Sequence, residues 1–137
     1  MLMNVMGEER SEPAVTITDG AAAAALFAPV FAGLAHEELH VALLDGDMRL
    51  LKRSQIPGSG HSVDVPLRAL IAEALALDAR GLVIAHNHPG GDATPSQADK
   101  AVTRRLAEIA APLELRLIDH LIFAGDQCAS FRAMGLL

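Results

Sequence analysis

The chain has 137 residues, of which 51% are apolar and 20% charged. This length suits one ordinary domain, and the apolar content is too high for an intrinsically disordered chain. We expect a flexible acidic N-terminal tail at residues 1–13 and a single domain at residues 14–137. The formal charge of −6 is the reverse of the basic surface that neutralises nucleic-acid phosphates, so it argues against strong nucleic-acid binding.

Targeting features and cysteine content further limit the class of protein and its compartment. The longest apolar stretch, residues 21–35, is too short for a bilayer and contains Pro29 and Gly33, so we expect a buried helix and no membrane span. The first residues lack the basic start and cleavage site of a secretory signal. Cys128 is the only cysteine, which excludes an internal disulfide and a cysteine-rich zinc site. Together these features predict a cytoplasmic protein.

The first half of the chain has the pattern of a strand, a helix and a hairpin. Asp19 precedes an alanine-rich apolar run, which is typical of a helix with an N-cap, and the run is apolar nearly all round, so this helix should be buried. Asp45-Gly46-Asp47 lies between two apolar runs and predicts an antiparallel hairpin. The expected elements are a strand at 14–18, a helix ending near Gly33, strands at 39–44 and 48–51, and a loop at 56–60.

The second half alternates strands and helices. Residues 82–85 form a short apolar run bounded by turn residues, as expected of a central strand covered on both faces. The expected elements are a helix from Pro66 to about Leu77, this central strand, a helix from Ser96 to about Ala110, and strands at 113–124 and 128–131. The alternation predicts an α/β or α+β fold in which helices flank a sheet.

A possible metal site follows the central strand. His86 and His88 are two residues apart at a strand end, so both imidazoles should lie on one side. Asp99 lies in the first turn of the next helix, and Pro89-Gly90-Gly91 lets the chain turn back. Two histidines and one aspartate would bind Zn²⁺ and leave its fourth position open to water, as in catalytic zinc sites. Such a zinc makes hydroxide available near neutral pH if a base accepts the proton.

Each part of this pattern also has a purely structural interpretation. A Ser96-x-x-Asp99 sequence often only caps a helix, and a lone His-x-His pair often only forms hydrogen bonds in a loop. Capping and metal binding are compatible. The combination of imidazoles, glycines, cap and carboxylate in one segment favours the metal.

The segment from His86 to Asp99 resembles the JAMM signature of the JAB/MPN metallohydrolases. His86-Asn87-His88-Pro89, with Gly91, Pro95-Ser96 and Asp99, is similar to the RadC-like branch of that family, and the resemblance continues to Asp119-His120 and the C-terminus. It implies a curved, mostly antiparallel sheet flanked by helices, the cytidine-deaminase-like JAB/MPN architecture. It also implies one zinc held by two histidines, one aspartate and a water.

The resemblance implies roles for two further residues. Glu37 corresponds to the family's general base, and Glu38 would point to the opposite face, although a register slip would exchange them. Ser96 corresponds to a serine that hydrogen-bonds the zinc-bound water or the oxyanion. Without the resemblance, Glu37 would be interpreted as a solvated residue at a strand start, and Ser96 as a cap.

The chain departs from the RadC-like pattern in two places. It has Pro66-Leu67-Arg68 where a His-Pro-Arg-like stretch is usual, and the short acidic lead cannot supply the usual helix-hairpin-helix region. The DNA-repair role attached to the RadC-like name is therefore poorly supported for this chain. The remaining single histidines, His40, His61 and His120, are interpreted as hydrogen-bonded or exposed rather than as ligands. Asp119 and His120 are candidates for contacts to the outer nitrogens of the ligands.

The leading hypothesis is a zinc-dependent hydrolase that cleaves an amide or isopeptide bond in a protein or peptide. The alternatives are a noncatalytic protein-binding module of the same fold and a DNA-associated factor. The hairpin edge or residues 134–137 could form a homodimer contact, or could pack on the domain itself.

Overall fold

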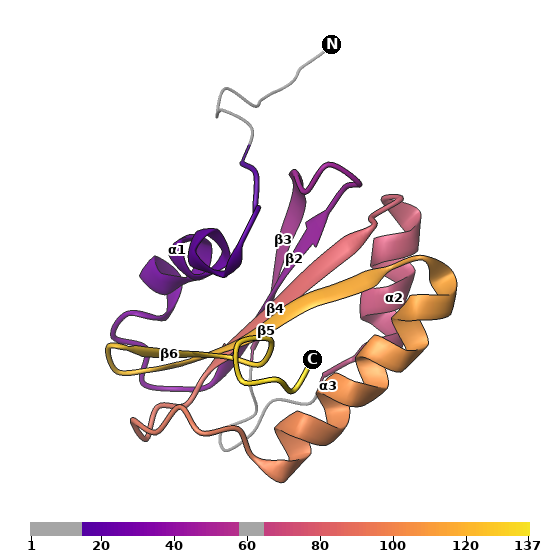
Figure 1. The fold of residues 1–137 in the computed structure, drawn as a ribbon. Helices are drawn as coiled ribbons and strands as arrows, with labels where there is room; N and C mark the ends of the chain where they lie inside the picture. The colour runs from indigo at the N-terminus through magenta and orange to yellow at the C-terminus, as the bar shows by residue number, and fades with distance from the viewer. Residues whose placement is uncertain (1–14, 58–64) are drawn as a thin grey trace.

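The computed structural model describes residues 15–57 and 65–137, which form one five-stranded sheet with helices on both faces (Figure 1). The predicted tail at 1–13, His61 and the end of the predicted loop lie outside the described residues. The elements are α1 (Gly20–Phe31), β2 (Glu38–Leu44), β3 (Leu50–Pro57), α2 (Leu67–Ala76), β4 (Gly81–Asn87), α3 (Gln97–Ala110), the 3-10 turn η1 (Ala111–Leu113), β5 (Arg116–Ala124) and β6 (Gln127–Ser130).

The sheet has the strand order β3-β2-β4-β5-β6, so β4 lies at its centre. The β3–β2, β2–β4 and β5–β6 pairs are antiparallel, and only β4–β5 is parallel. Every residue of β4 is buried, as expected of a strand with a neighbour on each side and helices on both faces. The predicted mixed fold with a mostly antiparallel sheet is confirmed.

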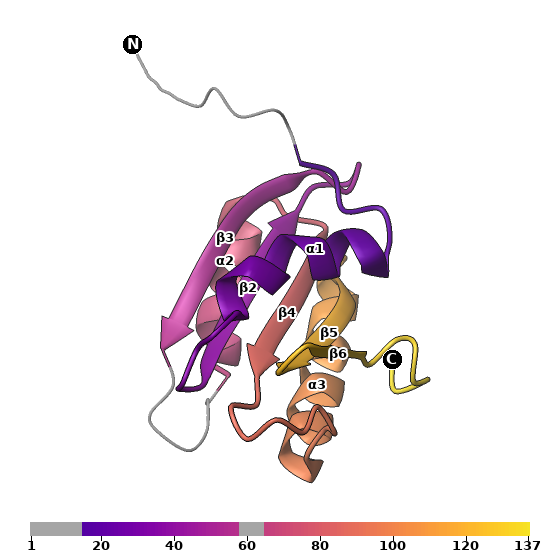
Figure 2. The ribbon, with the colours of Figure 1, turned by 90° about the vertical axis from the view of Figure 1, so that its left-hand side faces the viewer.

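Two hydrophobic cores lie on opposite faces of the sheet. Helix α1 covers one face, and α2 and α3 cover the other (Figures 1 and 2). Leu82 and Ile84 pack in the core that contains residues of α2 and α3, whereas Val83 and Ala85 pack in the core that contains residues of α1. This alternation along β4 determines the face to which each residue after Ala85 points.

Helix α1 is buried on one side only, which corrects the expectation of a fully buried helix. The Asp19 carboxylate caps it by accepting a hydrogen bond from the Ala22 N–H at 2.8 Å. Its buried residues, Ala23, Phe27 and Phe31, recur every four positions and so form one stripe. The outer face carries small residues, mostly alanine, whose exposure to water costs little.

The first predicted strand is a single bridge. Thr16 pairs with Arg49 as an isolated antiparallel bridge, flanked by 2.8 Å hydrogen bonds from the Ile17 N–H to Met48 and from the Leu50 N–H to Val15. The described part of the predicted strand thus lies against the hairpin turn without joining a ladder.

Two further boundaries differ from the prediction. β3 begins at Leu50 and continues through Ile56 and Pro57, which were expected in a loop. A proline is tolerated there because β3 pairs only with β2 and lies at the sheet edge. β5 begins at Arg116 and not at residue 113, because η1 and the left-handed Glu114 (φ 58°) turn the chain first.

No helix among the described residues is long and apolar enough to cross a membrane.

The central strand should dominate stability. Leu82 on β4 is 1% exposed, whereas Leu75 on α2 is 50% exposed. Leu82→Ala should lower the free energy of unfolding by about 2–5 kcal/mol, because it removes buried methyl groups and leaves a cavity. The same substitution at Leu75 should change it by less than about 0.5 kcal/mol. Urea denaturation measures both values, and equal losses would contradict this packing.

Candidate metal centre

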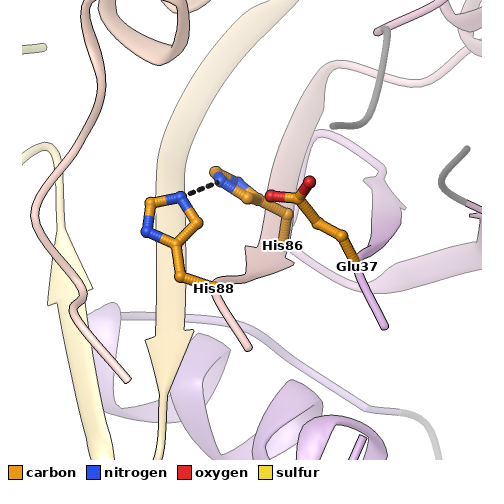
Figure 3. Close-up of side chains that lie close together, drawn as sticks. All are labelled: Glu37, His86 and His88. Carbon is orange, nitrogen blue, oxygen red and sulfur yellow. Dashed lines mark hydrogen bonds between the residues drawn. The ribbon is translucent and has the colours of Figure 1, made fainter. Parts of the chain in front are cut away.

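His86 and His88 meet where β4 ends, on the face covered by α3. His86 is buried, His88 is partly exposed, and their Nε2 atoms are 3.0 Å apart (Figure 3). The two imidazoles lie on the same side because one residue separates them along an extended strand, as the sequence predicted.

The outer nitrogen of each ring has its own partner. His88 Nδ1 is 2.8 Å from the backbone carbonyl of Asp92, and His86 Nδ1 is 2.7 Å from His120 Nε2. A carbonyl oxygen has no proton, so His88 Nδ1 donates and the neutral His88 ring presents a lone pair at Nε2. That lone pair faces His86 Nε2, so the two nitrogens are placed to bind one cation between them.

Asp99 reaches this pair from the first turn of α3. Its Oδ1 lies 3.5 Å from His86 Nε2 and its Oδ2 lies 3.3 Å from His88 Nε2. Gly91, with φ 93°, allows the chain after β4 to turn back toward the strand end. The structure thus brings together the three residues predicted as zinc ligands.

Ser96 and Asp99 form a capping box. The Asp99 N–H donates to Ser96 Oγ at 2.9 Å, and the Ser96 N–H donates to Asp99 Oδ2 at 2.8 Å. These bonds fix the carboxylate against the helix N-terminus. The capping role of Ser96 uses its oxygen as an acceptor and leaves its hydroxyl proton free for another partner.

Glu37 lies beside the histidine pair, immediately before β2. One ligand atom each from Glu37, His86 and His88 lies within 4.8 Å of the others (Figure 3). Glu37 Oε1 is buried and has no hydrogen-bond partner within residues 15–57 and 65–137. The neighbouring Glu38 points to the α1 face and binds His36 Nε2 at 2.8 Å and His40 Nε2 at 3.1 Å.

The carboxylates of Glu37 and Asp99 therefore both lie next to the histidine pair. The ligand atoms that all lie within 4.8 Å of one another come from Glu37, His86 and His88, whereas the sequence placed Asp99 in the ligand set. Imidazole nitrogens and carboxylate oxygens are the donors that zinc binds when cysteine is absent. A buried carboxylate oxygen that has no hydrogen-bond partner among the described residues, and that lies beside two imidazoles, also fits a cation at this position.

The two carboxyl groups differ in proton affinity. Burial raises the pKa of Glu37, and the nearby His86 and His88 only partly offset it. Burial would also raise the pKa of Asp99, but the neighbouring His86 imidazole and the hydrogen bond from the Ser96 N–H outweigh it and hold this pKa well below its usual range.

Asn87 is a part of the site that the sequence reasoning missed. It points to the α1 face, where Oδ1 accepts from the Glu38 N–H at 2.8 Å and Nδ2 donates to the His36 carbonyl at 3.0 Å. These two bonds hold the backbone on both sides of Glu37. The strand alternation placed Asn87 on this face, but the sequence contained no signal for its partners.

Asp119 and His120 are adjacent on β5 but lie in two different environments. His120 contacts His86, and burial followed by the charge of His86 lowers the pKa of His120 to about 3. Asp119 makes no contact with the candidate ligands, which corrects the expectation for it. Its carboxylate accepts from the N–H groups of His120 and Arg132 and from the Ser130 hydroxyl. Adjacent strand residues point to opposite faces, so only one of the two could reach the site.

Comparison with known proteins identifies the family of the chain. Residues 17–136 match the family model of the RadC-like JAB domain. The chain is 37% identical to the UPF0758 protein YkfG of Escherichia coli (strain K12) over 127 residues, covering 92% of this chain and 80% of YkfG. It is 36% identical to YfjY over 98% of this chain and 85% of that protein, and 38% identical to YeeS over 92% and 86%, both from the same organism.

Asn87 should contribute to stability through the backbone beside Glu37. Asn87→Ala leaves the Glu38 N–H and the His36 carbonyl without their partners, and should lower the free energy of unfolding by about 1–3 kcal/mol. Gln55→Ala removes an exposed amide on β3 and should change it by less than about 0.5 kcal/mol. If both variants unfold at the wild-type urea concentration, Asn87 does not hold this segment.

Proposed function

Because the chain belongs to the RadC-like JAB-domain family, we propose that it is a zinc-dependent hydrolase of amide or isopeptide bonds in a protein or peptide. In this proposal His86, His88 and Asp99 bind Zn²⁺, Glu37 is the general base, and Ser96 stabilises the oxyanion. The family assignment supplies the fold, and the proposal about chemistry depends on the site.

The observation that carries the proposal is the convergence of two imidazole nitrogens and carboxylate oxygens at the end of β4. His86 and His88 Nε2 are 3.0 Å apart, and the Asp99 oxygens lie 3.3 and 3.5 Å from them. The Asp92 carbonyl fixes the His88 ring with its lone pair inward. Side chains held in this way need little rearrangement to bind a metal.

The surrounding contacts favour Asp99 over Glu37 as the third ligand. The Asp99 carboxylate spans both imidazoles and is fixed by the capping box. Glu37 instead keeps one buried oxygen without a hydrogen-bond partner in the part of the chain that the structure describes. An unengaged carboxylate oxygen beside the ligands is suited to accept a proton during the reaction.

The chain's own groups then have separate tasks. When bound, zinc supplies Lewis acidity, which makes water nucleophilic at neutral pH and polarises a carbonyl. Glu37 Oε1 accepts the proton of the attacking water and delivers it to the leaving amine. The Ser96 hydroxyl, whose proton its cap does not use, donates to the developing oxyanion. Asn87 keeps Glu37 beside the histidine pair by holding the backbone around it.

Metal content tests the ligand set. Wild-type protein purified without an affinity tag should contain about one zinc per chain by elemental analysis. His88→Ala should lose most of it, and so should Asp99→Asn, which keeps an oxygen for the Ser96 N–H but removes the charge. His36→Ala removes an exposed histidine on the other face and should retain wild-type zinc. A zinc-free wild type after reconstitution would contradict the proposal and favour a noncatalytic binding module.

The role of Glu37 can be separated from that of its neighbour. Against a panel of peptides and lysine-linked isopeptides, Glu37→Gln should retain zinc but lose hydrolysis by about 100- to 10,000-fold, because the amide cannot accept the proton. Glu38→Gln alters a carboxylate on the opposite face and should keep most of the activity. Persistent turnover in Glu37→Gln together with loss in Glu38→Gln would identify Glu38 as the base.

A further inference from the structure

We infer that Thr103 and His120 select the ring tautomer of His86 that can bind zinc, and that they thereby set the zinc affinity of the site. This inference rests on the proposed zinc site. Thr103 and His120 are positioning residues, since they would act only through His86.

A chain of hydrogen-bond contacts runs from Thr103 on α3 through His120 on β5 to His86 on β4. Thr103 Oγ1 lies 2.6 Å from the Asp99 backbone carbonyl and 2.6 Å from His120 Nδ1, and His120 Nε2 lies 2.7 Å from His86 Nδ1. Thr103 and His120 are each 1% exposed, and the His120 ring stacks on Phe131 with a centroid distance of 4.5 Å. These polar groups are therefore satisfied by one another and not by solvent.

The hydrogen bond between Thr103 and the Asp99 carbonyl determines which atom donates in each of the other hydrogen bonds. A backbone carbonyl cannot donate, so the short contact with Asp99 requires the single hydroxyl proton of Thr103. Thr103 Oγ1 can then only accept from the ring beside it, which places the proton of His120 on Nδ1. The uncharged His120 ring has a lone pair at Nε2, and His86 Nδ1–H donates to it. His86 Nε2 is left with its lone pair directed into the site.

The opposite proton order would block the metal. If Thr103 donated to His120 Nδ1, the His120 proton would move to Nε2 and point at His86 Nδ1. His86 would then carry its own proton on Nε2, the atom 3.0 Å from His88 Nε2. The Asp99 carbonyl contact excludes this order. Helix α3 thus supplies both the carboxylate of Asp99 and, through Thr103, the tautomer of His86.

The test compares one substitution of Thr103 that removes the hydroxyl with one that keeps it. Thr103→Val keeps the branched shape and removes the hydroxyl, whereas Thr103→Ser keeps the hydroxyl. In competition titrations with a chromophoric chelator, Thr103→Val should bind zinc about 10- to 100-fold more weakly, the usual effect of losing a partner of a ligand histidine. Thr103→Ser should bind close to wild type. Equal zinc affinity of Thr103→Val and wild type would overturn the inference.

A second readout does not depend on zinc. Nitrogen-15 NMR of the zinc-free protein should show His86 protonated at Nδ1 in wild type and Thr103→Ser, and a tautomer mixture in Thr103→Val. A wild-type His86 protonated at Nε2 would overturn the inference even if zinc binds. A wild type that has the Nδ1–H tautomer but binds no zinc when zinc is added would instead contradict the proposed function alone.

A second pair of substitutions, at His120, covers the case in which Thr103→Val fails to fold. His120→Gln retains one acceptor and one donor, so it can still bridge His86 and Thr103, whereas His120→Phe cannot. His120→Gln should bind zinc more tightly than His120→Phe by about 10-fold or more. Equal affinities of the two variants would show that hydrogen bonding at this position does not matter.

Discussion

The alternation of side chains along the central strand β4 is the constraint on which the site depends. Residues of even number from Leu82 to His88 face α2 and α3, and residues of odd number face α1. His86 and His88 thus share one face, while Asn87 between them reaches the other side and holds the chain around Glu37. One strand end therefore supplies two candidate ligands and the support for the candidate base.

The neighbours of β4 complete the arrangement by register. β2 pairs antiparallel with β4, with Leu39 opposite His86, so the same register continued by two residues would bring Glu37 opposite His88. β5 runs parallel to β4 with His120 opposite Ile84, which places its imidazole between the His86 ring and α3. The capping box then fixes Asp99 at the start of α3. Local geometry and sheet pairing together position every group of the site.

Much of this arrangement could be predicted from short-range patterns. The His86-x-His88 spacing, the Ser96-x-x-Asp99 cap and the opposite parity of Glu37 and Glu38 depend only on strand and helix periodicity. His120 was a candidate for a contact to a ligand histidine together with Asp119, but which of the two reaches His86 depends on a parallel register shifted by an irregularity between Leu82 and Val83. The prediction also missed the exposed outer face of α1 and the extension of β3 through Pro57. Both depend on which elements pack against α1 and pair with β3, and the local sequence does not show this.

In the proposed site, His86, His88 and Asp99 hold a zinc ion while Glu37 stays free to move a proton. Anomalous diffraction at the zinc absorption edge, from crystals of the zinc-loaded protein, tests this ligand set. We expect one strong anomalous peak at about 2.0–2.2 Å from both Nε2 atoms and one Asp99 oxygen, with Glu37 outside bonding distance. A peak bonded to Glu37 in place of Asp99, or located away from the end of β4, would contradict it.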